Sequence, residues 1–123
     1  MIYLCQFPCS PKMRSISPFA IKLETWLRLT GIQYTNVYTS TFSKSTKQIP
    51  YIELNGEELA ETSVIIEKFK KIFQVDPDQM LNPKQRALGH SIKRMLESYT
   101  VKYAFYWRYG RMMPRFYEKV LSH

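Results

Sequence analysis

The chain has 123 residues, of which 45% are hydrophobic and 23% are charged, and its formal net charge is +8. This composition excludes a disordered tail, and the length suffices for one domain with its own core. No apolar run approaches the roughly 18 residues that a membrane-spanning helix needs, and no basic segment precedes the apolar start as in a signal peptide, so we expect a cytoplasmic protein.

The cysteines and the positive charges are unevenly distributed along the chain. Cys5 and Cys9 are too few for a disulfide scaffold, and no second cysteine pair or histidine cluster accompanies them, so we expect two reduced thiols and no metal. Residues 84–123 carry nine Lys and Arg against two Asp and Glu, whereas residues 1–83 carry nine against eight. The net charge therefore belongs to the C-terminal segment. The same segment holds eight aromatic residues: Tyr99, Tyr103, Phe105, Tyr106, Trp107, Tyr109, Phe116 and Tyr117.

The first element in chain order is a short apolar run, residues 2–7, which is typical of a buried strand. After a polar loop, Ser17 and Pro18 are the residue types preferred at the cap and at the first position of a helix. We expect that helix to end at Gly31, because glycine tolerates the left-handed conformation common there. Its apolar face is predicted from residues at i, i+4, i+7 and i+8: Phe19, Leu23, Trp26 and Leu27.

Three further strands are predicted in the next part of the chain. Residues 34–38 are rich in β-forming side chains, and residues 39–48 indicate a loop or a short irregular helix. Residues 51–54 and 57–60 flank Asn55-Gly56, the dipeptide most typical of a two-residue type I′ hairpin. The last two strands are therefore expected to be antiparallel neighbours.

Helical spacing dominates the remaining sequence. A helix is predicted from Thr62 to about residue 75, followed by a turn-rich connector at residues 76–83. A long helix is then expected over residues 84–109, broken by Gly110 and Pro114. Its predicted apolar stripe consists of Leu88, Ile92, Met95, Leu96, Tyr99 and Tyr103.

The order of these elements predicts an α/β fold. A strand, a helix and a strand require a parallel pair with a right-handed crossover, and the hairpin adds an antiparallel edge. The result is a four-stranded mixed sheet with flanking helices, the thioredoxin-like arrangement. We expect this domain at residues 1–75, a linker at 76–83 and a partial all-helical domain at 84–123.

Three motifs stand at corresponding places of a known superfamily. They are Ser17-Pro18-Phe19 at the start of the first helix, Ile49-Pro50 before the third strand, and L-A-E-T-S-V-I-I-E-K-F at residues 59–69. Together they resemble the N-terminal half of the glutathione S-transferase superfamily. More closely, Q-F-P followed by S-I-S-P-F-A-I-K-L-E-T-W-L-R-L is similar to the failed axon connections family, which is related to the metaxins. The resemblance extends to about Gly110.

The resemblance implies a catalytic role for Ser17. In the transferases, the thiol of glutathione lies at the N-terminus of the first helix, where the helix dipole and a hydroxyl hydrogen bond favour the thiolate. Ser17 occupies that position here. The alternative is that Ser17 is only a helix cap, as serine before proline commonly is. Cys9 ranks behind Ser17 for thiol chemistry, because it lies eight residues before the motif.

The second and third motifs imply contacts with the rest of glutathione. By resemblance, Pro50 is cis and turns the Ile49 backbone toward the cysteinyl part of the ligand; the alternative is that Pro50 merely begins the strand. Thr62 is implied to hold the γ-glutamyl carboxylate, because helix N-termini favour anions, while Glu61 faces the ammonium. The alternative is that Thr62 or Ser63 simply caps the helix.

Two further interpretations concern charged residues. Lys47 lies two residues before Ile49 and is placed to approach the glycyl carboxylate, although a loop lysine is commonly just solvated. In the C-terminal segment, the coherent apolar spacing favours packing against further helices, with the cations on the outer face. An interfacial helix on an anionic membrane ranks second and a nucleic-acid contact last.

Two functional hypotheses follow. The first is a glutathione S-transferase-like protein of the failed axon connections and metaxin-related group, which binds glutathione with weak or no transferase activity. Activity is in doubt because the transferase pattern continues through further helices that form most of the electrophile pocket. The second is a non-catalytic interaction module that docks a partner protein or a second copy through its aromatic helix. The alternative to a cytoplasmic location is the cytosolic face of the mitochondrial outer membrane.

Overall fold

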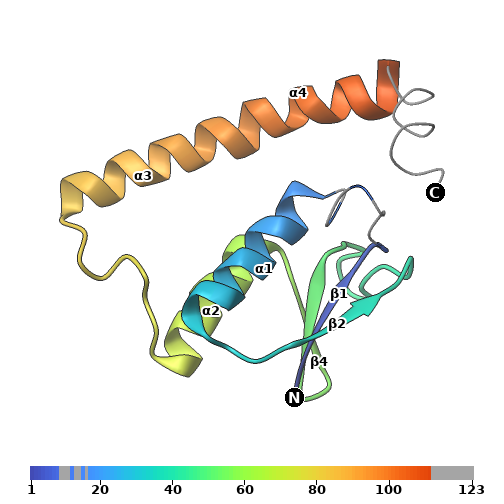
Figure 1. Cartoon of the computed structure of the whole chain (residues 1–123), viewed down its shortest axis with the longest axis horizontal. Helices are drawn as coiled ribbons and strands as arrows, with labels where there is room; N and C mark the ends of the chain where they lie inside the picture. Colours follow the sequence, from blue (N-terminus) through green and yellow to red (C-terminus); the bar gives the residue numbers. More distant parts are fainter. Residues whose placement is uncertain (9–11, 13–14, 16, 112–123) are drawn as a thin grey trace. The chain divides into compact units, whose positions relative to one another are not determined.

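Figure 1 shows a computed structural model of the chain, which describes residues 1–8, 12, 15 and 17–111. Cys9 and Pro114 lie outside the described residues. The chain divides into two compact units, Met1–Pro77 and Asp78–His123. Each unit is considered by itself below.

A four-stranded sheet organises the first unit. It consists of β1 (Ile2–Gln6), β2 (Thr35–Tyr38), β3 (Tyr51–Leu54) and β4 (Glu57–Ala60), in the spatial order β2-β1-β3-β4. Strands β1 and β2 are parallel, while β3 is antiparallel to both β1 and β4. The predicted mixed sheet and its thioredoxin-like order are confirmed.

The tight turn between β3 and β4 has the predicted geometry. Asn55 and Gly56 have φ values of +51° and +87°. Positive φ at both central residues is the requirement of the type I′ turn, which matches the twist of the flanking strands. The hairpin prediction is therefore confirmed, and it aligns β4 with β3.

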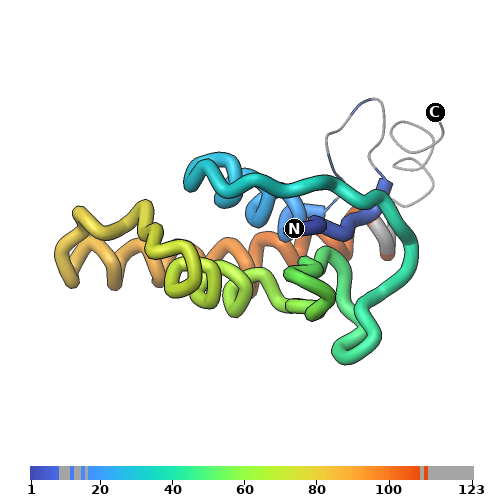
Figure 2. The backbone as a smooth tube through the Cα atoms, turned by 90° about the horizontal axis from the view of Figure 1, so that it is seen from below, coloured from blue at the N-terminus to red at the C-terminus, as the bar shows by residue number. Residues whose placement is uncertain are grey.

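Two helices, α1 (Pro18–Thr30) and α2 (Thr62–Phe73), lie side by side in the first unit (Figures 1 and 2). As predicted, Ser17 caps α1 and Gly31 ends it in the left-handed conformation. The buried face of α1 differs from the predicted one, since Ala20 and Glu24 are buried while Phe19 and Trp26 are only half-buried. The core contains residues from the sheet and both helices: Ile2, Leu4, Leu23, Leu27, Ile52, Leu59, Ile65 and Phe69.

The connection between β2 and β3 is a loop. Ser43, which is only 1% exposed, anchors it: its N–H donates to the Gln48 carbonyl at 3.0 Å and its Oγ accepts from the Gln48 N–H at 2.9 Å. The Lys47 N–H also donates to the Ser43 carbonyl at 2.9 Å. These bonds fix the chain immediately before Ile49-Pro50.

A long helical run forms the described part of the second unit. Asn82 caps it, and its successive segments are α3 (Pro83–Met95), the π-helical η1 (Leu96–Thr100), α4 (Val101–Phe105) and the π-helical η2 (Tyr106–Arg111). The predicted break at Gly110 is wrong, because Gly110 lies inside η2; the wider π-helical turn continues through it. No helix in the described part of the chain combines the length and apolar character needed to cross a bilayer.

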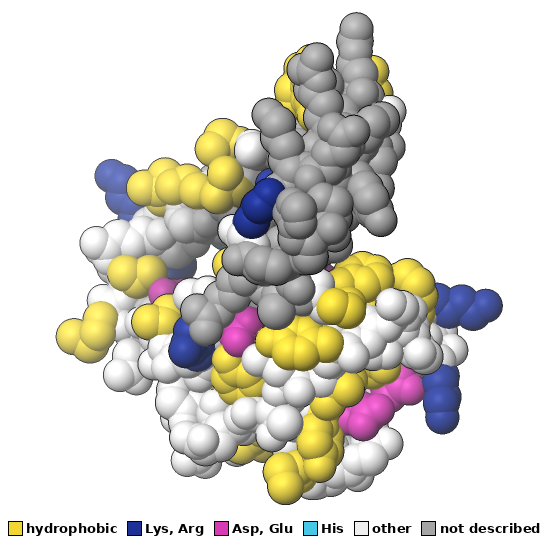
Figure 3. All heavy atoms as spheres, turned by 45° about the vertical axis from the view of Figure 1, so that its right-hand side comes forward, with side chains coloured by type: hydrophobic (Ala, Val, Ile, Leu, Met, Phe, Trp, Pro, Cys, Tyr) yellow, Lys and Arg dark blue, Asp and Glu magenta, His cyan; other side chains and the backbone are white. Residues whose placement is uncertain are grey.

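The apolar stripe of this helical run is on the surface. Each of its six members is between 45% and 75% exposed, and the predicted packing against further helices stays a prediction. Hydrophobic side chains at the surface are also visible in the space-filling view of Figure 3. The members are Leu88, Ile92, Met95, Leu96, Tyr99 and Tyr103.

Candidate functional site

Sheet topology brings the three predicted motifs to one edge of the sheet. Because β1 and β4 are both antiparallel to β3, they end at the edge where β3 begins. Cys5, Tyr51 and Ala60 are register partners across the three strands. Pro50 and Glu61, the next residues outward, therefore reach the same edge, which we call the site edge.

The start of α1 also lies at the site edge. The Lys22 ammonium, in the second turn of α1, is 3.1 Å from the Thr62 Oγ1 in the first turn of α2. Since α2 follows β4 directly at this edge, the N-terminal turns of both helices are held together there. Ser17 stands at the beginning of α1, one turn before Lys22.

Ser17 caps α1 and still has a proton to donate. Its Oγ accepts a hydrogen bond from the Ala20 N–H at 3.3 Å, while its own N–H donates to the Ser15 Oγ at 3.1 Å. A serine hydroxyl can accept and donate at once. Within the described part of the chain, the Ser17 O–H proton has no partner. The cap and a hydrogen bond to a ligand thiolate are therefore compatible.

The segment before β3 offers an unpaired backbone to the site edge. The Ile49-Pro50 peptide bond is cis, as the resemblance implied. Pro50 is buried and Ile49 half-buried. Among the described residues, neither the N–H nor the C=O of Ile49 has a hydrogen-bond partner. An extended peptide can satisfy both groups, as a neighbouring strand would.

Glu61, rather than Thr62 or Ser63, caps α2. Its carboxylate accepts from the Val64 N–H at 3.0 Å and the Ser63 N–H at 3.4 Å. The two contacts leave acceptor capacity on an exposed side chain. The Glu61 backbone has φ +72° and ψ 108°, a region that non-glycine residues rarely adopt and that its surroundings must impose.

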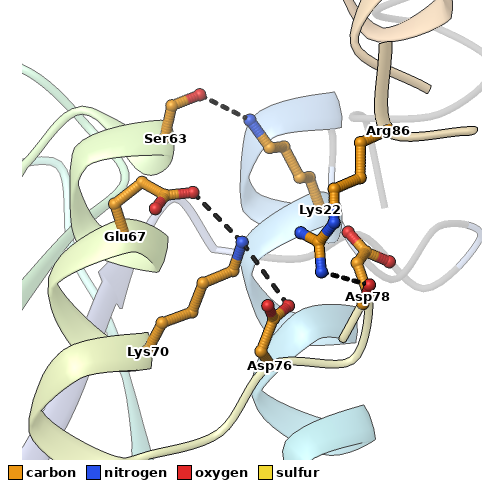
Figure 4. Close-up of polar contacts among 7 residues, drawn as sticks. All are labelled: Lys22, Ser63, Glu67, Lys70, Asp76, Asp78 and Arg86. Atoms are coloured by element: carbon orange, nitrogen blue, oxygen red, sulfur yellow. Dashed lines mark hydrogen bonds and ion pairs between the residues drawn. The ribbon is translucent and has the colours of Figure 1, made fainter. Parts of the chain in front are cut away.

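Thr62 is buried at the start of α2 and contacts Lys22, a residue that no sequence motif marks as functional. Thr62 is 5% exposed, and the Lys22 ammonium donates to its Oγ1 at 3.1 Å and to the Ser63 Oγ at 3.1 Å. Figure 4 shows Lys22 reaching from α1 toward Ser63. By its spacing, Lys22 is an ordinary polar residue of an amphipathic helix. Only the packing of α1 against α2 brings its ammonium to Thr62 and Ser63.

Lys47 lies beside a shallow hollow next to the site edge. The hollow has a volume of about 490 Å³ and is lined by Phe42, Ser43, Lys44 and Lys47. Lys47 is exposed and has φ +53°. Its ammonium is therefore accessible, two residues before Ile49.

A buried polar network next to the site edge connects β1 to α1 and β2. The Glu24 carboxylate accepts from the Tyr34 hydroxyl at 2.8 Å, the Asn36 Nδ2 at 3.2 Å and the Gln6 Nε2 at 3.4 Å. The Gln6 Nε2 also donates to the Asn36 Oδ1 at 2.8 Å. These bonds tie the last residue of β1 to α1 and β2. The apolar spacing of α1 gave no sign that Glu24 is buried.

Cys5 is not suited to nucleophilic chemistry. It is 3% exposed, and burial raises the pKa of its thiol, although a hydrogen bond with Tyr51 opposes that shift. Burial and the bond to Cys5 raise the pKa of Tyr51 to about 12. Cys5 therefore stays a protonated free thiol at neutral pH.

Comparison with known proteins places this fold in a family. The profile of the glutathione S-transferase N-terminal domain matches residues 18–116, most of the chain. The chain belongs to the glutathione S-transferase N-terminal domain family. The match begins one residue after Ser17 and includes the Ile49-Pro50 and Glu61-Thr62 segments of the site edge.

A curated relative shares much of this sequence. The chain is 40% identical over 109 residues to the protein Failed axon connections of Drosophila melanogaster. The aligned part covers 88% of this chain and 26% of that protein. The chain thus spans about a quarter of the length of the relative it matches.

Proposed function

We propose that the chain binds glutathione at the site edge, with weak or no transferase activity. The observation that carries the proposal is the convergence of the start of α1, the unpaired Ile49 backbone and the start of α2 at one edge of the sheet. Family membership supports glutathione as the ligand. The site edge offers hydrogen-bonding or charged groups that suit the thiol, the peptide groups and the charged ends of glutathione.

The proposal assigns each part of the ligand to named groups. The Ser17 hydroxyl donates to the thiolate at the N-terminus of α1, where the helix dipole also favours negative charge. The Ile49 backbone, held in place by buried Pro50, pairs with the cysteinyl residue. The hydroxyl and the N–H of Thr62, at the start of α2, receive the γ-glutamyl carboxylate. Glu61 accepts from the ligand ammonium, and Lys47 approaches the glycyl carboxylate.

Calorimetry with glutathione tests this function. We expect saturable heat with glutathione, and a lower affinity for S-methylglutathione, because its thioether cannot ionise to accept the Ser17 proton as a thiolate. An absence of heat up to millimolar glutathione would contradict the proposal.

A substitution at Thr62 tests the assigned carboxylate contact. Thr62→Val should weaken glutathione binding by about 1 to 3 kcal/mol, since a charged group loses a hydrogen-bond partner. Thr41→Val, at an exposed position of the loop between β2 and β3, is the matched control and should leave the affinity unchanged. Equal affinities for Thr62→Val and the wild type would reduce Thr62 to a structural residue.

The exposed stripe of the helical run favours a second candidate function, a protein-interaction module. Tyr99 and Tyr103 are 75% and 64% exposed on a face that also carries Ile92 and Leu96. Large apolar surfaces of this kind are typical of contact sites. Sedimentation velocity tests self-association: a concentration-dependent dimer that Tyr99→Ser with Tyr103→Ser abolishes would support it, and a monomer at all concentrations would exclude a second copy as the partner.

A further inference from the structure

The hollow next to the site edge has an aromatic lining residue that the proposed function leaves unused. The hollow has a volume of about 490 Å³, and one of its lining residues is Phe42, which is 48% exposed. The Phe42 ring meets the Phe7 ring edge-on, with ring centroids 5.9 Å apart and an interplanar angle of 84°. Because this aromatic contact holds the Phe42 ring in place, the hollow presents a fixed apolar surface.

Hydrogen bonds also fix the backbone of the loop that lines the hollow. The Ser43 Oγ contacts the Thr46 Oγ1 at 2.8 Å and accepts from the Gln48 N–H at 2.9 Å. The Lys44 N–H donates to the Glu58 carboxylate of β4 at 3.0 Å. These bonds lie within the protein, so a group bound in the hollow need not order the loop.

Two lysines line the same hollow and present accessible ammonium groups. Lys44 and Lys47 are both exposed, and among the described residues neither ammonium has a hydrogen bond or an ion pair. The proposed function uses Lys47 for the glycyl carboxylate of glutathione. Lys44 is then available to a carboxylate that lies further along a ligand.

The assigned direction of the ligand points its C-terminal end at the hollow. The γ-glutamyl end is assigned to Thr62 and the cysteinyl residue to the Ile49 backbone, so the ligand continues from Ile49 toward Lys47. A fourth residue follows the cysteine by two positions, which is at most about 7 Å along an extended chain. Lys47 likewise lies two residues from Ile49. A residue after the glycine therefore comes within reach of the hollow.

We propose that the site accepts γ-glutamyl-cysteinyl-glycyl peptides that continue beyond the glycine, with an apolar fourth side chain against Phe42 and the terminal carboxylate paired with Lys44. This inference rests on the proposed glutathione function. It names the ligand class more narrowly, as thiol tetrapeptides with an apolar C-terminal residue. Glycine has no side chain to contact Phe42, so glutathione leaves this surface uncovered.

Calorimetry of the full chain with three ligands tests the inference. The ligands are glutathione and two tetrapeptides that extend it by one residue, glycine in the first and phenylalanine in the second. We expect the phenylalanine peptide to bind about tenfold more tightly than the glycine peptide, because only its side chain removes apolar surface of Phe42 from water.

Two variants assign the effect to named side chains. Phe42→Ala should abolish the difference between the tetrapeptides and leave the affinity for glutathione unchanged. Lys44→Met should weaken the binding of both tetrapeptides several-fold but not that of glutathione, because only their carboxylates reach Lys44. Leu29→Ala and Lys71→Met remove exposed side chains of α1 and α2 as matched controls and should change none of the affinities.

Three results would overturn the inference while binding of glutathione to the wild type leaves the proposed function in place. The first is equal wild-type affinity for the two tetrapeptides, which decides the question even if Phe42→Ala does not fold. The second is an equal loss of glutathione and the phenylalanine peptide in Phe42→Ala. The third is a tetrapeptide affinity that Lys44→Met leaves unchanged. Failure of the wild type to bind any of the three ligands would overturn both the inference and the proposed function.

Discussion

At the residue scale, the hydroxyls of Ser17 and Thr62 at the site edge already have structural partners. Ser17 accepts from the Ala20 N–H, and Thr62 accepts from Lys22. In each case the structural contact uses a lone pair of the oxygen and leaves its proton or a second lone pair for a ligand. The direction of these hydrogen bonds therefore makes the structural role of each hydroxyl compatible with the proposed contact to a ligand.

Substitutions at Ser17 separate its two roles. Ser17→Ala should lower the free energy of unfolding by about 1 kcal/mol through loss of the cap, and Ser17→Asp should restore it, because aspartate caps equally well. Both variants should raise the thiol pKa of bound glutathione, since neither donates a proton to the thiolate. Urea denaturation and ultraviolet titration of the complex measure the two effects. A thiol pKa that is the same in wild type and both variants would leave Ser17 as a helix cap alone.

The Cys5–Tyr51 pair predicts a loss of stability at alkaline pH. Both groups are acids whose pKa is raised on folding, from 9.0 for the thiol and from 10.0 to about 12 for the phenol. The folded state therefore holds these protons to a higher pH than the unfolded state, and stability falls as the pH rises from about 9 toward 12.

Tyr51→Phe should make this alkaline loss smaller, because the phenol no longer ionises on unfolding. Urea denaturation at neutral and alkaline pH measures it. Tyr99→Phe is the matched control, since Tyr99 is 75% exposed. The prediction fails if the two variants lose stability with pH to the same extent.

At the scale of elements, helix α2 begins and ends at non-glycine residues with positive φ. Glu61 precedes it at φ +72°, and Gln74 follows it at φ +52°, ψ +47°. At the N-terminal end, the residue with the unusual conformation, Glu61, lies at the site edge. At the C-terminal end Gln74 simply donates its N–H to the Lys70 carbonyl, and the side chains of Lys70, Glu67 and Asp76 are paired nearby (Figure 4).

Gln74→Gly should therefore stabilise the protein by about 1 kcal/mol, because glycine adopts the left-handed conformation without the steric cost that other residues pay. Gln33→Gly is the control: Gln33 is an exposed loop residue without positive φ, and the same change there should be neutral or destabilising. Thermal and urea denaturation measure the difference. A similar loss of stability in both variants would show that the conformation at Gln74 carries no cost.

At the scale of the whole molecule, the hydrophobic core belongs to one unit. Every residue of the core cluster lies within residues 1–77. None of the residues described from Asp78 onward is buried. The first unit is thus a packed domain, whereas the described part of the second is a helical run with an exposed apolar stripe.

The fragment 1–77 should accordingly fold alone and unfold cooperatively, because every residue of the core cluster is retained. The near-ultraviolet circular dichroism spectrum of the fragment should match the contribution of the same residues in the full chain. The fragment should also keep the affinity for glutathione, since all assigned ligand contacts lie within it. A fragment without cooperative unfolding would mean that the helical run supplies stability to the first unit.

Local patterns in the sequence determined most of the fold. The cap at Ser17, the end of α1 at Gly31 and the hairpin at Asn55-Gly56 were predictable because each depends on the backbone preferences of one or two residues. The order of strands and helices then left the thioredoxin-like sheet as the natural arrangement. The motifs that resemble glutathione S-transferases pointed to residues that do converge at one sheet edge.

Only the tertiary structure decided how those residues are used. The burial of Glu24 and the contact of Lys22 with Thr62 depend on contacts between elements distant in sequence. Glu61 rather than Thr62 caps α2 through local hydrogen bonds, in a positive-φ backbone conformation that its surroundings impose. Helical periodicity shows which side of a helix is apolar, but not what the polar residues at its border meet. The exposed stripe shows the same limit: spacing predicts an apolar face, while its burial requires a packing partner.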